Sequence, residues 1–427
     1  MLIRISNDGK TFHLRNRFFS YIMTVLANGQ IENLYFGKAV HDRESFAHLH
    51  EETRRAMSAF NAPEPSQLSL VNTRQEYPAY GTGDYRYPAF EVEQANGSRI
   101  SGFKLVGYLT HPGKPGLAPL PATYMESEDE GETLTLKLVD EVTKLSLYLS
   151  YTIYADRPIL TRNASFELFG EEPVILTRAL SMNLDLPDMD YEMVTFTGAW
   201  GRERAIKVRK LEHGVQSIYS MRGSSSAEMN PFFMLRRPGT TETRGETFGF
   251  NIVYSGSYLS QVECCTFGTA RVQIGIHPDN FNWRLTQGES FQTPEVIIAF
   301  SEDGMTGVSQ VFHDLIRERL IRGKYKKEAR PILLNNWEAT EMNFDEDAIL
   351  RIAEKAKEVG IELFVLDDGW FGARNHEHAG LGDWVVNLEK LPNGVKGLSE
   401  KIEAMGLKFG LWIEPEMVNM DSDLYRA

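Results

Sequence analysis

Hydrophobic and polar residues alternate with a period of two over about the first 300 residues of the chain. In KLSLYLSYTIYA the residues Leu145, Leu147 and Leu149 fall on one face, and in GETLTLKL the residues Leu134 and Leu136 do the same. Similar runs recur in FGFNIVYSG, ARVQIGIHP and EVIIAFS, with Gly, Pro, Asn and Asp between them. Because period-two runs separated by turn residues are typical of antiparallel sheets, residues 1–303 are predicted to form a large β-sandwich.

The segment RFFSYIMTVLANG could be mistaken for a signal peptide, because Arg17 precedes an apolar run. It lies behind a predicted strand, TFHLRN, and Asn28-Gly29 separates it from IENLYFGKAV. Asn-Gly between two apolar stretches is a strong hairpin signal, so a β-hairpin is predicted here. No run approaches the roughly 18 apolar residues of a membrane span, and we therefore expect a soluble chain with no membrane partner.

The pattern changes from period two to helical spacing near residue 305. Val308, Val311, Phe312 and Leu315 recur at helical intervals in GVSQVFHDLIRERLIRG. A polar, basic stretch, KYKKEAR, follows and ends at Pro331. Residues 304–330 are therefore predicted to be a helix and a linker between two domains.

From residue 331 to residue 427 apolar strands and amphipathic helices alternate. PILLNNW, IELFVL and LKFGLWIEPEM are the predicted strands, and NFDEDAILRIAEKAKEVG and VKGLSEKIEAMG are the predicted helices. Asn343 and Glu346 have capping-box spacing at the start of the first helix, and Gly360 suits its end. The apolar stripe of that helix is Ile349, Ile352, Ala353, Ala356 and Val359. Strands joined through helices are expected to be parallel and covered on both faces.

This predicted α/β region is too short for a complete barrel. A closed (β/α)₈ barrel typically needs about 250 residues, whereas residues 331–427 hold three predicted strands and two predicted helices. The region is either a small three-stranded unit or the first three strands of a truncated (β/α)₈ barrel. We expect an amino-terminal fragment with an incomplete barrel.

Charge and cysteine content narrow the class of protein. The formal net charge is −14 and the pI is near 5.3, which argues against a nucleic-acid partner. The one basic stretch, GRERAIKVRK at 201–210, is predicted to be a solvated strand or loop. The two cysteines, Cys264 and Cys265, are adjacent and would face opposite sides of a strand. Two unrelated thiols are predicted, which fits a reducing cytoplasm.

Polar and aromatic residues follow each of the three predicted parallel strands. Ligands of parallel α/β folds bind beyond the carboxyl ends of the strands. Carboxylates beside tryptophans, without a glycine-rich phosphate loop, favour a neutral sugar, whose hydroxyls donate to carboxylates and whose C–H face packs on indole. The candidate residues are Asn335, Asn336, Trp337 and Glu338 after the first strand, Asp367, Asp368 and Trp370 after the second, and Trp412, Glu414 and Glu416 after the third.

Structural explanations compete with this hypothesis. A single aspartate at a strand end often caps the next turn, Trp337 and Trp412 could fill a core, and Glu414 or Glu416 could be a buried salt-bridge partner. His376 and His378 form a His-x-His pair, but they lie in a glycine-rich stretch that is predicted to be a solvated loop. No metal site, nucleophile motif or dinucleotide fingerprint is therefore predicted, and no cofactor is expected.

These strand-end segments resemble those of one enzyme family. GIELFVLDDGW, PILLNNWEAT, LGDWVVNLEKLPNG and KFGLWIEPEMVN are similar to motifs of the α-galactosidases (melibiases) of glycoside hydrolase family 36. EYPAYGTGDYRYPAF, LPATY, TGAWGRER and ESFQTPEV resemble segments of that family's sandwich domain. The resemblance covers essentially the whole chain.

The resemblance implies a β-supersandwich followed by a (β/α)₈ barrel, and retaining hydrolysis of terminal α-galactosyl residues, as in melibiose and raffinose. Asp367 and Asp368 would bind the hydroxyls on C4 and C6 of galactose. Trp337 and Trp412 would wall the galactose pocket, and Trp200 matches a position associated with substrate contact. A galactoside would be the small-molecule partner, and the full-length protein would be a homo-oligomer, a tetramer.

One departure from the family pattern decides the expected activity. The family's nucleophile lies in a Lys-Trp-Asp motif, and its acid/base aspartate follows a later glycine-rich motif; neither segment occurs here. No catalytic residue is therefore predicted within the chain, which is expected to be inactive alone. The alternatives are a non-catalytic sugar-binding module, a related α-N-acetylgalactosaminidase or galactosyl transferase, and a metal-dependent barrel enzyme using Asp367, His376 and Glu414.

Overall fold

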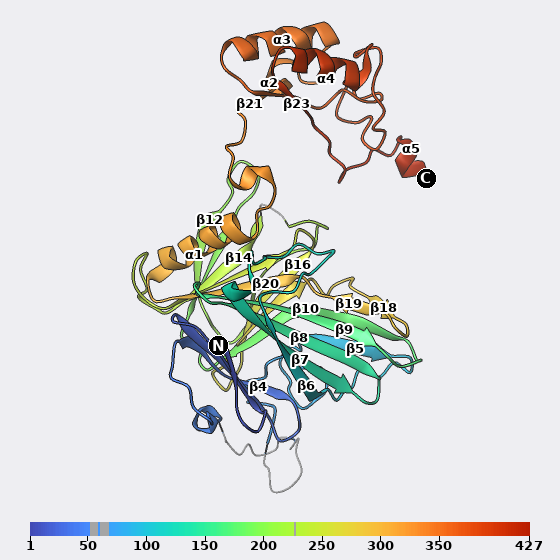
Figure 1. Cartoon of the computed structure of the whole chain (residues 1–427). Coiled ribbons are helices and arrows are strands. Elements are labelled where there is room, and N and C mark those ends of the chain that lie inside the picture. Colours follow the sequence, from blue (N-terminus) through green and yellow to red (C-terminus); the bar gives the residue numbers. More distant parts are fainter. Residues whose placement is uncertain (52–58, 60–67, 226–227) are drawn as a thin grey trace. The chain divides into compact units, whose positions relative to one another are not determined.

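The structure is a computed structural model of the 427-residue chain, and it describes all residues except 52–58, 60–67 and 226–227 (Figure 1). The described residues form two compact units, Met1–Arg322 and Gly323–Ala427. The boundary between them falls inside the predicted linker, 304–330. No helix among the described residues is long and apolar enough to cross a membrane.

The first unit begins with a four-stranded antiparallel sheet in the order β1-β2-β3-β4. Its strands are β1 (Ile3–Ile5), β2 (Thr11–Arg15), β3 (Phe19–Val25) and β4 (Ile31–Lys38). β3 and β4 pair across the Asn28-Gly29 turn, where Gly29 has a φ of 87°. The predicted hairpin is confirmed, because glycine alone adopts that backbone conformation without a steric cost.

Two larger antiparallel sheets complete the first unit within the described residues. The ten-stranded sheet has the order β12-β11-β14-β15-β20-β9-β8-β7-β6, with β19 pairing β9. The six-stranded sheet has the order β13-β16-β17-β10-β18, with β5 also pairing β10. Their strands are β5 (Phe90–Gln94), β6 (Lys104–Pro112), β7 (Gly131–Asp140), β8 (Leu145–Tyr154), β9 (Ile159–Leu168), β10 (Val174–Leu186), β11 (Glu192–Thr197), β12 (Ala205–Lys210), β13 (Gly214–Ser220), β14 (Met229–Arg236), β15 (Thr247–Val253), β16 (Tyr258–Cys264), β17 (Ala270–Ile276), β18 (Trp283–Leu285), β19 (Ser290–Gln292) and β20 (Glu295–Ser301).

The alternating leucines form the core of this sandwich. Leu134 and Leu136 of β7 and Leu145, Leu147 and Leu149 of β8 are all buried in one hydrophobic cluster that draws on all three sheets. Residues two apart in a strand point to the same face, so the alternating leucines of each strand lie on one face of the sheet. The predicted antiparallel sandwich is confirmed.

The predicted solvated basic segment is an edge strand. All six residues of β12 are exposed, and β12 pairs only with β11 among the described strands. Lysine and arginine side chains along such an edge discourage pairing with another chain. Cys264 and Cys265 are both free thiols, as predicted.

Buried ion pairs anchor the segment EYPAYGTGDYRYPAF to the six-stranded sheet. Asp84 accepts from Arg86 at 2.8 Å and from Arg271 of β17 at 2.7 Å. Arg271 also pairs with Asp185 of β10 at 2.7 Å, and all four side chains are buried. Because each buried charge has an opposite partner, this network is structural.

The predicted linking helix packs on the first unit. Helix α1 (Gly304–Arg319) places Val308, Phe312 and Leu315 in a cluster with residues of β14, β15 and β20. A Cβ at Gly249 of β15 would lie 2.4 Å from Val308 and 2.7 Å from Phe312, so only glycine allows this close approach. The three 3₁₀ helices among the described residues are Ala47–Leu49, Glu128–Glu130 and Lys324–Lys326.

The second unit is a three-stranded parallel sheet in the order β21-β22-β23. Its strands are β21 (Leu333–Asn335), β22 (Leu363–Leu366) and β23 (Lys408–Leu411), and its helices are α2 (Trp337–Thr340), α3 (Glu346–Glu358), α4 (Gly394–Ala404) and α5 (Asp423–Arg426). α3 and α4 lie on the same side of the sheet (Figure 1). The predicted alternation of parallel strands and helices is confirmed.

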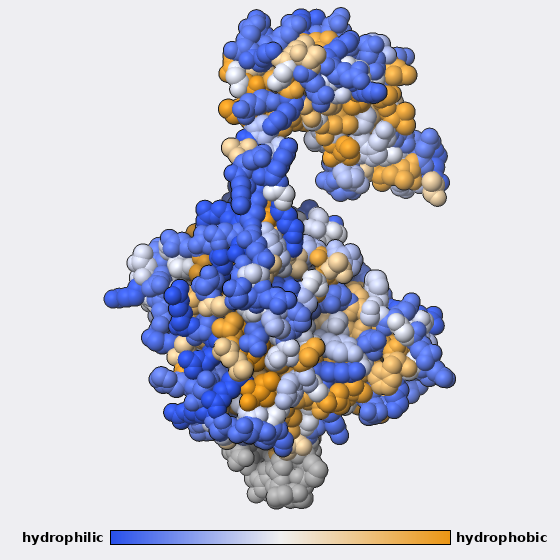
Figure 2. All heavy atoms as spheres, in the orientation of Figure 1, coloured by the Kyte–Doolittle hydropathy of each residue, from blue (hydrophilic) through white to orange (hydrophobic). Residues whose placement is uncertain are grey.

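Cover on both faces of this sheet was predicted, and that prediction is wrong for the described residues. Phe364 and Leu366 of β22 are buried against α3 and α4, whereas Leu363 and Val365 on the opposite face are partly exposed. Leu333 is 52% exposed. Figure 2 shows a largely hydrophilic outer side of the two helices and hydrophobic side chains away from them.

Two details of α3 also differ from the prediction. The N-cap is Asp345, whose side chain accepts from the amide of Ala348, and not Asn343. Glu346 bonds to Asn393 instead of closing a capping box. Val359, predicted in the apolar stripe, is exposed because it follows the last helical turn, and Gly360 ends the helix with a φ of 88°.

Candidate functional site

The carboxyl ends of the three parallel strands meet at one edge of the sheet in the second unit. Asn335 of β21 is in register with Val365 of β22, and Leu366 of β22 is in register with Leu411 of β23. The residues that follow these strands are therefore neighbours. The structure brings together Asn335, Asp367, Asp368, Trp412 and Glu414, as the sequence predicted.

Asp367 is buried and held by neutral donors. Its Oδ1 accepts from the amide of Asp368 at 2.8 Å, and its Oδ2 accepts from Asn335 Nδ2 at 2.5 Å. The Asp367 amide in turn donates to Oδ1 of the fully buried Asn336 at 2.8 Å. Both oxygens of this carboxylate are therefore fixed in direction by the chain itself.

Asp368 is buried and held by a cation. Arg374 Nε donates to Asp368 Oδ1 at 3.0 Å, and Arg374 Nη2 donates to Asp368 Oδ2 at 2.8 Å. The sequence analysis did not identify Arg374. A signal was available, because a cation lowers the cost of burying two adjacent carboxylates and FGARNHEHAG carries a single arginine.

Lys390 binds three backbone carbonyl groups around the Asp368–Arg374 ion pair. Its Nζ donates to the carbonyl of Met342 at 2.7 Å, of Gly369 at 2.8 Å and of Arg374 at 3.2 Å. Burial lowers the pKa of Lys390, while the charge of Asp368 acts in the opposite direction. Sequence reasoning also missed Lys390, which lies in the segment LGDWVVNLEKLPNG.

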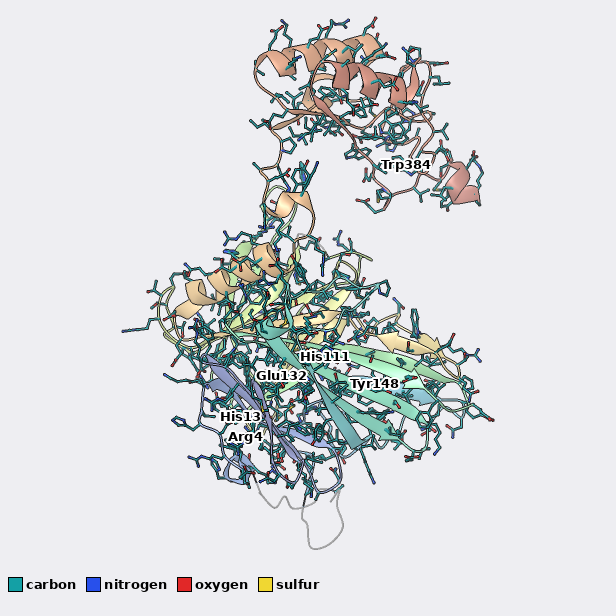
Figure 3. The ribbon with its side chains drawn as sticks, viewed as in Figure 1. Arg4, His13, His111, Glu132, Tyr148 and Trp384 are labelled. Carbon is teal, nitrogen blue, oxygen red and sulfur yellow. The ribbon has the colours of Figure 1, made fainter. Side chains whose placement is uncertain are left out.

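Indole rings pack beside the carboxylates. Trp370 is buried and donates from Nε1 to the carbonyl of Trp412 at 3.0 Å, so it is a core residue. Trp412 and Trp337 are both partly exposed. Trp384, labelled in Figure 3, lies 6.4 Å from the Trp412 ring, centroid to centroid. Trp337 and Trp412 thus keep surface that a sugar ring could cover, and Trp384 supports Trp412.

Glu414, like Lys390, has a shifted pKa. Burial raises its pKa, the charges of Glu416 and Asp368 raise it further, and Arg374 lowers it. A carboxyl group with a raised pKa can donate a hydrogen bond or a proton. Glu416 is exposed.

His376 and His378 are exposed in the turn that follows Arg374. Their rings are 6.3 Å apart, and His376 Nδ1 accepts from the amide of His378 at 3.2 Å. In the part of the chain that the structure describes, no three His, Cys, Asp or Glu side chains are grouped to hold a metal ion. The geometry therefore offers no support for the metal-dependent alternative.

Trp200 lies in the first unit, in the turn between β11 and β12, and its side chain is 94% exposed. Its predicted substrate contact stays a prediction.

Comparison with known proteins assigns the chain to a family. The family model described as "Glycosyl hydrolase family 36 N-terminal domain" matches residues 29–286, and the one described as "Melibiase" matches residues 290–427. The chain belongs to glycoside hydrolase family 36. The predicted family is confirmed.

Relatives of this family 36 chain are longer than the chain itself. The α-galactosidase AgaA of Geobacillus stearothermophilus is 47% identical over 426 residues, which are 100% of the chain and 58% of AgaA. The crystal structure of α-galactosidase AgaB from the same organism matches with a TM-score of 0.94 and 47% identity, over 100% of this chain and 58% of AgaB. A variant of AgaA in complex with raffinose matches with a TM-score of 0.93 and 48% identity, over 98% of this chain and 58% of the variant.

These matches confirm the predicted fold class. The family 36 chain has the antiparallel β-supersandwich followed by the first three strands of the (β/α)₈ barrel. It spans 58% of the length of the relatives named above.

Proposed function

We propose that this family 36 chain forms the galactose-binding part of a retaining α-galactosidase, which removes terminal α-linked galactose from oligosaccharides of the melibiose and raffinose type. The observation that carries the proposal is the pair of buried, oriented carboxylates at the end of β22, Asp367 and Asp368. The α-galactosidase relatives and the raffinose complex of an AgaA variant support this substrate class.

Each residue of the proposed site has a physical role. Asp367 and Asp368 accept hydrogen bonds from the hydroxyls on C4 and C6 of galactose, because ionised carboxylates are strong acceptors. Trp337 and Trp412 pack their partly exposed rings against the C–H face of the sugar. The Asn335 amide, the Asp368 amide and Arg374 orient the two carboxylates, and the remaining acceptor positions can take the hydroxyls of a neutral sugar.

We assign bond cleavage to groups outside residues 1–427. Retaining hydrolysis uses two carboxyl groups about 5 Å apart, one as nucleophile and one as acid/base. Asp367 and Asp368 are instead fixed by Asn335 and Arg374, which suits a binding role. The 427-residue chain is therefore expected to bind galactose and to release no product.

The test is to mix the purified 427-residue chain with nitrophenyl α-galactoside and to measure both binding and nitrophenol release. Binding without release supports the proposal. Release of nitrophenol would show that the chain contains its own catalytic pair. Turnover or tighter binding of an α-N-acetylgalactosaminide would favour the related N-acetylgalactosaminidase, and galactosyl transfer to a second sugar would favour the transferase.

We further propose a homo-tetramer for the full-length protein and a cytoplasmic location. The fully exposed Trp200, beside the edge strand β12, supports a surface that approaches a neighbouring subunit's substrate. The two free thiols support a reducing compartment. Light scattering of the native protein and of a Trp200→Ala variant tests the first point, and fractionation of cells tests the second.

A further inference from the structure

Arg374 is a buried guanidinium between a strand end and a turn. It is 5% exposed, and it contacts Asp368 through Nε and Nη2 at 3.0 and 2.8 Å. Its remaining nitrogen, Nη1, donates to the carbonyl of Glu377 at 2.7 Å and of Ala379 at 3.0 Å. One side chain therefore ties the carboxylate after β22 to the turn 376–379.

The backbone around Arg374 is also fixed. Lys390 Nζ donates to the Arg374 carbonyl at 3.2 Å. A Cβ at Gly380 would lie 2.9 Å from Arg374 Cβ and 3.0 Å from its amide nitrogen, and Gly380 has a φ of 86°. The turn thus packs directly against Arg374, which leaves the guanidinium little freedom to rotate away from Asp368.

This arrangement restricts the rotation of one carboxylate and balances its charge. A planar guanidinium that bonds both oxygens of a carboxylate sets its plane, which a lysine ammonium cannot do. A carboxylate has about four acceptor positions, so acceptor capacity remains for a ligand hydroxyl. Asp367, the adjacent carboxylate, accepts from Asn335 and from the Asp368 amide, which are both neutral donors.

We propose that Arg374 is a positioning residue that holds the Asp368 carboxylate in the orientation needed to accept a sugar hydroxyl. This inference rests on the proposed function, because it assumes that Asp368 contacts galactose. Arg374 itself acts through Asp368 and is assigned no contact with the sugar.

The variants that test this role are Arg374→Gln, Arg374→Lys and Asp368→Asn. Arg351→Gln is the matched control, because Arg351 is an exposed arginine on α3 of the same unit. Galactose affinity of the 427-residue chain is measured by ligand-observed NMR, with glucose as the C4 epimer for comparison. Thermal unfolding of each variant shows whether it folds.

Arg374→Gln is expected to weaken galactose binding about tenfold or more, because the buried carboxylate loses a charged partner. Arg374→Lys, which keeps a cation without the planar fork, is expected to fold and to lose affinity to a smaller degree. Both are expected to reduce the preference for galactose over glucose, and Arg351→Gln is expected to leave affinity and preference unchanged.

A double-mutant cycle separates positioning from general support of the turn. If Arg374 acts through Asp368, then Arg374→Gln causes little further loss of affinity in an Asp368→Asn background. If Arg374 only supports the turn, the two losses add.

The outcomes distinguish this inference from the proposed function. Loss of binding in Asp368→Asn with unchanged affinity in both Arg374 variants, or additive losses in the cycle, would overturn the role of Arg374 and leave the proposed function standing. Absence of galactose binding by the unaltered chain, or unchanged binding in Asp368→Asn, would overturn both.

Discussion

Asp367 and Asp368 are neighbours in sequence but are held by different means. Neutral amide donors fix Asp367, whereas Arg374 fixes Asp368. Two adjacent ionised carboxylates repel each other, and a cation on one of them reduces that cost. The charge of Asp368 nevertheless reaches Glu414, whose pKa it helps to raise.

The Asp368→Asn variant is expected to lower the pKa of Glu414. Burial remains the largest cause of its raised pKa, but one of the two negative charges that act on it is removed. A ¹³C NMR titration of the Glu414 carboxyl measures the change. Asp347→Asn, an exposed change on α3, is the control and should leave the titration unaltered; an unchanged or higher pKa in Asp368→Asn would contradict this electrostatic account.

His13 of β2 makes the first unit sensitive to acid. Burial lowers its pKa, Asp42 opposes this, and Arg15 and Arg4 add to it; Figure 3 labels His13 and Arg4 on the N-terminal strands. The unfolded chain therefore binds a proton near the usual pKa of about 6.5, before the folded chain does, so stability falls as pH falls below that value.

In a His13→Gln variant the loss of unfolding free energy between neutral and mildly acid pH is expected to be smaller than in the unaltered chain. Urea unfolding followed by fluorescence at several pH values measures it. His277 has a pKa lowered by burial as well, so part of the acid sensitivity remains. Identical pH dependence in the two proteins would show that His13 does not contribute.

At the scale of elements, the sequence was most informative where one period extends through a whole strand or helix. The alternating leucines of β7 and β8 and the Asn28-Gly29 turn follow from local chemistry alone. Glu346 could not be placed in the same way, because Asn393, its partner, lies 47 residues further along the chain. The same holds for Arg374, whose role depends on how a turn folds back onto β22.

The corrected N-cap of α3 gives a quantitative expectation. Asp345→Ala should lower the unfolding free energy of the second unit by about 1 kcal/mol, because the amide of Ala348 loses its acceptor. Asn343→Ala, at the cap position expected from sequence, should change it by less than about 0.5 kcal/mol. Chemical denaturation of both variants decides between the two positions, and equal losses would argue against Asp345 as the cap.

At the scale of the whole molecule, the chain is organised around separate cores. The clusters of the sandwich and of α1 use residues before 322, and the cluster of the parallel sheet uses residues from 334 onward. The basic connection between them is exposed at Lys327 and Arg330. The change of pattern near Pro331 was visible in the sequence. The packing of α1 on β15 was not, because it depends on Gly249, which has no side chain to keep the helix away.

Brief treatment with trypsin is expected to cut first within residues 323–331 and to leave a protected product that ends near Arg322. Exposed lysine and arginine residues in a connecting segment are the preferred sites for such cleavage. Mass spectrometry of the products identifies the cut. Early cleavage within β7, β8 or α1 would contradict two separately folded units.

The close contact between Gly249 and α1 has a practical consequence for anyone who wishes to produce the sandwich by itself. A gene that ends at codon 303, just after the last strand of the sandwich, would lack helix α1, which covers Val253 and Ile297. The hydrophobic surface exposed in this way would favour aggregation of the protein. A gene that extends to Arg322 includes α1 and keeps this surface covered.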